Sequence, residues 1–200
     1  MSAEFFETMA PYAQQASQET GVPVSVILAQ WALESGYGTS RFAKEGLNFG
    51  GIKLSSNSPT KEYMIQGGTG AKFAKYSSIS QFVEDYVRVL KLGYYKAVRE
   101  AGDALKAMEA LAQSPYDAGG YAGGKLQKVW SQWNLQKYDD MEGLKVPGPA
   151  GPETGINIPA EVLAGDKRFL GWFLLGVGVL VIIRALGGDP DQVKEVADRA

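Results

Sequence analysis

The sequence predicts a mostly helical α+β domain, followed by a linker and one apolar helix. Three observations support this fold class. Apolar residues recur at helical spacing through most of residues 2–133. Between residues 60 and 76 this spacing gives way to two short segments around a glycine-rich turn, which favours a small β-hairpin. Residues 144–160 are rich in proline and glycine, and residues 161–187 contain a long apolar stretch.

Two helices are predicted at the start of the chain. Residues 2–18 have the periodicity of an amphipathic helix. Residues 25–33 are good helix formers, and Gly36 and Gly38 supply the stop signal. The inward side of the first helix is predicted to be Phe5, Phe6, Met9, Tyr12, Ala13 and Ala16.

The central part of the chain is predicted to alternate short elements with turns. Thr39 or Ser40 caps a short helix that ends at Gly46, and residues 48–54 are irregular and extended. Predicted strands at 60–65 and 71–76 flank the turn at 67–70, and further helices are expected at 79–92, 94–101, 103–112 and 125–133. Asp103 is the expected N-cap of the helix that follows it.

Composition excludes several classes of function. The 200 residues carry 20 Lys and Arg against 22 Asp and Glu, a formal net charge of −2, without a basic patch for nucleic acid. The sequence has no histidine and no cysteine, which excludes Ser-His-Asp and Cys-His nucleophiles, the usual zinc sites and disulfides. Carboxylates, hydroxyls and tyrosines remain for catalysis, and no metal or organic cofactor is expected.

Glu34 is the candidate catalytic carboxylate. It follows Ile27 and Trp31 at i+7 and i+3, so it shares their apolar stripe and should be partly buried near the helix C-terminus. Burial and the negative end of the helix dipole both favour the protonated form, which suits a general acid. The alternative is a boundary residue that faces solvent or pairs with Arg41 or Lys44.

The segment around Glu34 resembles the glucosaminidase domain of glycoside hydrolase family 73, which includes flagellar-rod and autolysin-type peptidoglycan hydrolases. The family pattern S-x-x-x-A-Q-x-x-L-E-S-G-W-G-x-S, then N-x-F-G-I-K, is matched between Ser25 and Lys53. Tyr37 stands where the family usually has tryptophan, and the extra Gly51 splits the final F-G-I-K. The resemblance covers roughly residues 4–138 and implies a lysozyme-like domain, assigned to residues 1–143.

This resemblance implies further site residues. Glu62 matches the second acidic residue of a T-x-E-Y motif on the hairpin, and is taken as base or charge stabiliser beside the general acid Glu34. Without the resemblance, Glu62 would be interpreted as a solvent-exposed charged residue at the edge of the hairpin. Tyr116 matches the first tyrosine of a G-Y-A-T-D-x-x-Y motif and is a candidate catalytic residue, although anchoring a loop is an equal alternative. Substrate binding is assigned to Tyr37, Asn48, Phe49, Tyr63 and Tyr121.

The function implied is cleavage of the glycan strand of peptidoglycan, at the bond that follows N-acetylglucosamine. A muramidase or a lytic transglycosylase of the same fold is the alternative within the enzyme class, because both use a single essential glutamate. From another class, the alternative is an inactive glycan-binding membrane protein. The expected partners are therefore peptidoglycan and a lipid membrane, without nucleic acid or metal.

The C-terminal region is predicted to hold the membrane anchor. Residues 144–160 form a linker, residues 161–187 include an apolar span at 169–186, and residues 188–200 form a short polar tail. The span is eighteen residues long if Arg184 extends its charged end to the membrane surface, which is short for a transmembrane helix. A buried helix of a soluble domain is the alternative. Because no secretory signal is recognised at the start of the chain, we expect a single-pass protein of a virion internal membrane, with the bacterial cell envelope as the alternative.

Overall fold

The computed structural model describes residues 2–116, 121 and 123–141. These residues belong to the first of two units, 1–154, and none lies in the second, 155–200. The predicted linker, apolar span and polar tail therefore lie outside the described residues. Within the described part of the chain, no helix is both long enough and apolar enough to cross a membrane.

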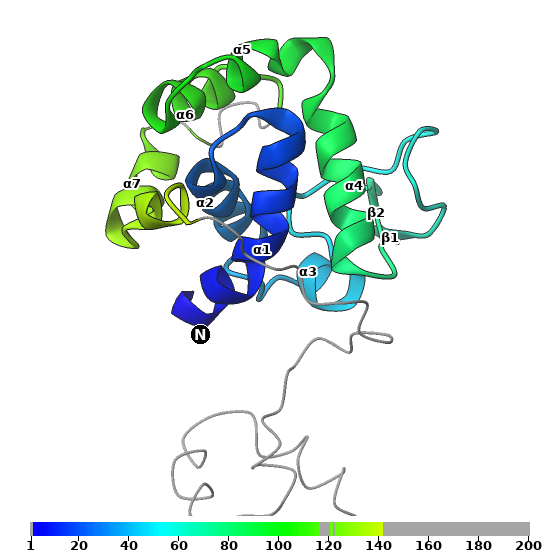
Figure 1. Cartoon of the computed structure of the whole chain (residues 1–200). Helices are drawn as coiled ribbons and strands as arrows, with labels where there is room; N and C mark the ends of the chain where they lie inside the picture. Colours follow the sequence, from blue (N-terminus) through cyan, green and yellow to red (C-terminus); the bar gives the residue numbers. More distant parts are fainter. Residues whose placement is uncertain (1, 117–120, 122, 142–200) are drawn as a thin grey trace, which may run out of the picture. The chain divides into compact units, whose positions relative to one another are not determined.

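The described residues are mostly helical, with one small sheet (Figure 1). This confirms the predicted α+β class with helices dominating. In chain order the elements are α1 (Ser2–Thr20), α2 (Val24–Ser35), α3 (Arg41–Gly46), β1 (Tyr63–Ile65), β2 (Lys72–Ala74), α4 (Ile79–Leu90), η1 (Gly93–Tyr95), α5 (Lys96–Arg99), α6 (Ala104–Ala112), α7 (Lys125–Gln132) and η2 (Leu135–Tyr138).

Helix α2 lies at the centre of the domain and contacts α1, α6, α7 and η2 (Figure 1). Ten of its twelve residues are buried. The prediction of one apolar stripe on this helix was too narrow, because neighbouring helices cover it on several sides. Helix α1 also packs on α4, and its six predicted core residues are all buried.

The sheet is an antiparallel hairpin in which Tyr63 lies opposite Ala74 and Ile65 lies opposite Lys72. Its strands are shorter than predicted. Thr60 is bound to this edge through its side chain, because its hydroxyl donates to the Lys75 carbonyl at 2.8 Å. Strand β1 contacts α3.

Capping residues set several helix boundaries as predicted. The Ser40 hydroxyl accepts from the backbone N–H of Ala43, and the Asp103 carboxylate accepts from that of Lys106. The single helix expected at 94–101 is instead a 3₁₀ turn followed by the four-residue α5. The 3₁₀ helix η2 was not predicted.

Candidate active site

The sequence after Glu34 ends α2 within two residues. Gly36 adopts a left-handed conformation with φ +57°, and its N–H caps the carbonyls of Ala32 and Leu33. The Ser35 hydroxyl donates to the Trp31 carbonyl at 2.6 Å and accepts from the N–H of Gly38 at 2.8 Å. These bonds fix the last turn of the helix, and with it the backbone that carries Glu34.

The Glu34 carboxylate is partly buried, and each of its oxygens has a neighbour from a different loop. The Tyr121 hydroxyl donates to Oε1 at 2.5 Å. On the other side, Gly51 has φ +61°, and a Cβ there would lie 3.0 Å from Oε2. Glycine at position 51 therefore allows close approach of the backbone to the carboxylate. The carboxylate is held from both sides.

A chain of hydrogen bonds continues from Tyr121 into the core. Gln30 Nε2 donates to the Tyr121 hydroxyl oxygen at 3.0 Å, and the Tyr86 hydroxyl donates to Gln30 Oε1 at 2.6 Å. Gln30 and Tyr86 are fully buried or nearly so. The sequence predicted Tyr86 to be a core residue and gave neither residue a functional role. The signal was present for Gln30, because it precedes Glu34 by four residues and so shares its helix face.

The tyrosines near Glu34 are neutral hydrogen-bond donors. Burial, and next the charge of Glu34, raises the pKa of the Tyr121 hydroxyl above its ordinary value. The same two causes raise the pKa of Tyr86. For Tyr116 burial is again the largest cause, and Tyr86, Tyr121 and Glu34 add to the rise in its pKa. Each phenol therefore keeps its proton at neutral pH.

The segment that carries Gly51 is held in place by Asn48 and Tyr116. The Asn48 amide donates to the carbonyls of Ile52 and Ala74, at 2.9 and 2.8 Å, and its oxygen accepts from the Ile52 N–H at 2.9 Å. The Tyr116 hydroxyl donates to the Gly50 carbonyl at 2.8 Å. Both side chains therefore support the loop beside Glu34, and their direct roles toward substrate stay predictions.

The second predicted carboxylate lies at the start of the hairpin. Glu62 precedes β1, its side chain is 73% exposed, and its Oε2 lies 3.2 Å from Lys75 Nζ. The neighbouring Tyr63 is exposed as well, and Lys72 Nζ lies 4.4 Å from the centre of its ring. Glu62 and Tyr63 are thus accessible to a polymer that lies along the hairpin. Their predicted roles are not tested by these contacts.

Two of the four aromatic residues predicted to bind substrate, Tyr37 and Phe49, lie within an aromatic cluster. The Tyr37 ring is 5.9 Å from that of Phe6 and 6.1 Å from that of Trp133. Phe49 is buried, and its ring is 5.5 Å from that of Phe82. Both rings therefore fix the turn after α2 and the loop after α3. Substrate binding by either ring stays a prediction.

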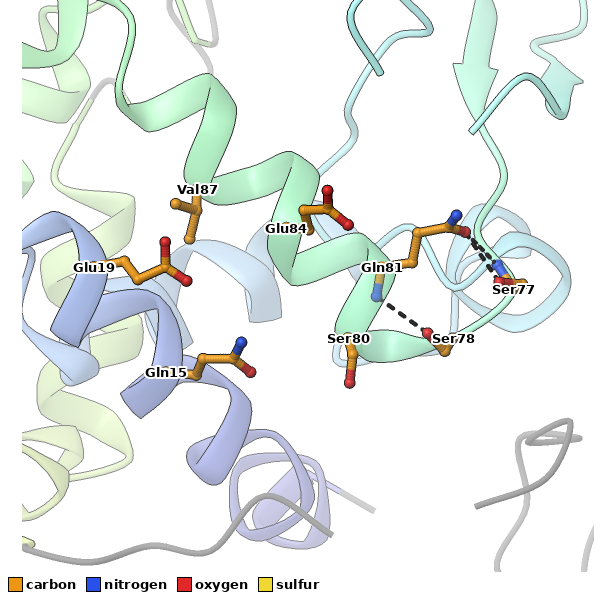
Figure 2. A pocket seen from close by; sticks show the side chains of 8 residues that line it. All are labelled: Gln15, Glu19, Ser77, Ser78, Ser80, Gln81, Glu84 and Val87. Atoms are coloured by element: carbon orange, nitrogen blue, oxygen red, sulfur yellow. Dashed lines mark hydrogen bonds between the residues drawn. The ribbon is translucent and has the colours of Figure 1, made fainter. Parts of the chain in front are cut away.

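A separate polar hollow lies between α1 and α4 (Figure 2). It has a volume of about 560 Å³, and Glu34 does not line it. Several of its polar groups cap α4: Ser78 Oγ accepts from the Gln81 N–H, and Gln81 Oε1 accepts from the N–H and hydroxyl of Ser77. Because these groups already bond to one another, the hollow is a less suitable site than the surroundings of Glu34. Within the described residues, no group of acidic side chains is arranged to hold a metal ion.

Comparison with known proteins gives one family and several relatives. The glucosaminidase family, described as mannosyl-glycoprotein endo-beta-N-acetylglucosaminidase, matches residues 10–143. Peptidoglycan hydrolase FlgJ of Escherichia coli K12 is 35% identical over 147 residues, which are 66% of this chain and 46% of that protein. The chain thus spans about half the length of this curated relative.

Solved structures of the same kind are similar over most of the described residues. The glycoside hydrolase domain of FlgJ from Salmonella typhimurium is 30% identical with a TM-score of 0.58, covering 68% of this chain and 91% of that one. A peptidoglycan hydrolase from Sphingomonas sp. A1 is 26% identical with a TM-score of 0.58, covering 72% and 99%.

Proposed function

The chain belongs to the glucosaminidase family of glycoside hydrolases, and from this premise we propose that it cleaves the glycan strand of peptidoglycan. The resemblance predicted from the residues between Ser25 and Lys53 is confirmed by the family match. The relatives compared above are named peptidoglycan hydrolases, and the family description names an endo-acting N-acetylglucosaminidase. These names support cleavage at the bond that follows N-acetylglucosamine.

The observation that carries the proposal is the setting of the Glu34 carboxylate. It stands at the end of a buried helix, is itself partly buried, and has Oε1 bound by the Tyr121 hydroxyl at 2.5 Å. Glycoside hydrolysis needs a carboxyl group that protonates the leaving oxygen. A donor that binds one carboxylate oxygen fixes the orientation of the whole carboxyl group. Glu34 is therefore the general acid.

Glu62 is the second carboxylate of the proposed mechanism. An exposed carboxylate at the hairpin edge can activate water or stabilise the positive charge that develops on the sugar ring. Its ion pair with Lys75 joins two solvent-exposed side chains, so the pair contributes little to folding stability. The position thus leaves Glu62 available to substrate, and Tyr63 beside it offers a ring face for stacking on a sugar.

The test of the scissile bond is product analysis with the full-length chain. Purified peptidoglycan is digested, the new reducing ends are reduced with borohydride, and the terminal sugars are identified by mass spectrometry. We expect N-acetylglucosaminitol. Reduced N-acetylmuramic acid would identify a muramidase, and a 1,6-anhydromuramyl end would identify a lytic transglycosylase. Either of these products would contradict the proposed bond.

The proposed localisation rests on sequence alone. Residues 169–186 anchor the enzyme in a lipid bilayer, and we place the protein in the internal membrane of a virion, where it would open the cell wall during entry. The bacterial cell envelope is the alternative. Co-flotation of the full chain with phospholipid vesicles, lost when residues 169–186 are deleted, tests the anchor. Recovery only from particle-free cell envelopes would contradict the virion assignment.

A further inference from the structure

Three hydrogen bonds link the buried core to the Glu34 carboxylate, and they all point the same way. The Tyr86 hydroxyl donates to Gln30 Oε1, Gln30 Nε2 donates to the Tyr121 oxygen, and the Tyr121 hydroxyl donates to Glu34 Oε1. The residues come from α4, α2 and the loop before α7, and we call them the Tyr86–Gln30–Tyr121 relay. It reaches Oε1 of the carboxylate, whereas Gly51 lies close to Oε2.

Counting donors shows that the direction of the relay is coupled to the state of Glu34. An ionised carboxylate can only accept, so Tyr121 must donate its single proton to it. The Tyr121 oxygen is then an acceptor, which requires the NH₂ group of Gln30. The Gln30 oxygen consequently faces Tyr86, and Tyr86 must donate. When Glu34 is ionised, its charge therefore determines which group donates and which accepts in every hydrogen bond along the relay.

We propose that Gln30 and Tyr86 are positioning residues that keep the Tyr121 hydroxyl donating to Glu34 Oε1, which prevents the acid proton of Glu34 from being directed towards Tyr121 and the core. This inference rests on the proposed role of Glu34 as general acid. While Oε1 accepts from the Tyr121 hydroxyl, a proton on the Glu34 carboxyl group cannot be donated to Tyr121.

The relay also has a reversed arrangement, which is unproductive. If the Gln30 amide turns over, its oxygen accepts from Tyr121, and Tyr121 can then only accept from Glu34. The acid proton moves to Oε1 and points into the core. The Tyr86 hydroxyl opposes this, because its buried proton would lose Gln30 Oε1, the acceptor that it now has at 2.6 Å. Removing that hydroxyl should favour the reversed arrangement and the protonated form of Glu34.

The test compares two buried tyrosines. Tyr86→Phe removes the relay donor. Tyr76→Phe is the matched control, because its hydroxyl is also buried but donates to Asp85 at 2.8 Å, and both rings pack near Phe82. The readout is the ¹³C carboxyl resonance of Glu34 in the full-length chain labelled at glutamate Cδ, assigned by its loss in Glu34→Gln. Among the described residues, the titratable groups whose charges interact with Glu34 include Tyr121, Tyr116 and Tyr86.

We expect the Glu34 carboxyl to titrate at higher pH in Tyr86→Phe than in the wild type, and to be unchanged in Tyr76→Phe. Hydrolysis of purified peptidoglycan at neutral pH should fall about three- to tenfold in kcat for Tyr86→Phe, with KM unchanged, because one hydrogen bond orients the acid. Gln30→Met should shift the titration the same way. Methionine is neutral and of similar length, but it cannot donate to Tyr121 or accept from Tyr86. This variant supplies a second measurement if Tyr86→Phe unfolds.

Glu34 titration that is identical in wild type, Tyr86→Phe and Gln30→Met, with all three folded, would overturn the relay and leave these residues as packing. An equal shift in Tyr76→Phe would overturn it as well. The titration needs no substrate, so it separates this inference from the proposed function. A shifted titration in a protein that releases no glycan fragment would retain the relay and reject the hydrolase.

Discussion

Gly51→Ala tests whether the backbone beside Glu34 must approach the carboxylate closely. The substitution has two effects that the structure separates. Alanine at φ +61° is strained by about 1 to 2 kcal/mol, and its Cβ would lie 3.0 Å from Glu34 Oε2, several tenths of an ångström inside ordinary contact. The carboxylate must therefore shift by that amount, away from the position that its Tyr121 hydrogen bond defines.

Gly102→Ala is the matched control for this substitution. Gly102 has φ +76°, and a Cβ there would meet no atom of the described residues within 4 Å. It carries the same backbone strain without touching Glu34. Both variants should lose about 1 to 2 kcal/mol in the free energy of unfolding, seen as thermal midpoints about 3 to 8 °C lower.

Catalytic activity should distinguish Gly51→Ala from Gly102→Ala. Because displacing a reacting group by 1 Å costs about a hundredfold in rate, we expect Gly51→Ala to lose about tenfold in kcat, and Gly102→Ala to retain wild-type kcat. Release of reducing ends from purified peptidoglycan, measured well below both melting midpoints, gives the rates. If the two variants keep equal activity, close approach of Gly51 has no role in the chemistry and the geometric reasoning is refuted.

Three further predictions concern the second carboxylate, a buried ion pair and alkaline pH. Glu62→Gln should change the free energy of unfolding by less than about 1 kcal/mol, since its pair with Lys75 is exposed, yet lower kcat at least tenfold; unchanged kcat would remove Glu62 from the mechanism. Arg88→Leu should cost about 3 kcal/mol in urea unfolding, because it strips the ion pair at 2.6 Å from Asp85, which is fully buried; a loss under about 1 kcal/mol would contradict this. In the unfolded chain the tyrosines ionise from about pH 10, whereas burial raises the pKa of Tyr86 and the other buried phenols in the folded state. Above pH 10 the folded state therefore retains more protons than the unfolded state. The free energy of unfolding must then fall as the pH rises past 10. Chemical unfolding at pH 8 and pH 11 measures this fall, and Tyr86→Phe should make it smaller; equal stabilities at the two pH values would contradict the raised pKa values.

Local signals predicted the helical framework well, because each acts over a few residues. The stop at Gly36 and the caps at Ser40 and Asp103 depend on backbone conformation and neighbouring N–H groups, which a short sequence specifies. The same signals placed Glu34 at the end of its helix. They overestimated the strands of the hairpin, where a side chain rather than the backbone ladder binds Thr60 to its edge.

The contacts of the carboxylate could not be predicted in this way. Tyr121 lies 87 positions after Glu34, and its bond depends on how the loop before α7 returns to α2. The resemblance assigned Tyr121 to substrate binding, which stays a prediction, and the structure adds that its hydroxyl donates to the candidate acid. Gly51 was recognised only as an insertion, because its close approach to Glu34 requires a left-handed backbone that the sequence permits but does not specify.

The most direct test of the central claim compares the full-length chain with Glu34→Gln on purified peptidoglycan. Glutamine keeps the size of the side chain and cannot donate an acid proton, so folding, checked by the thermal midpoint, should be nearly unchanged. We predict that the wild type releases glycan fragments, detected by mass spectrometry, and that Glu34→Gln releases none. Equal release by both proteins would contradict the assignment of Glu34 as general acid. No release by either, with both folded and bound to peptidoglycan, would identify a glycan-binding protein instead of a hydrolase.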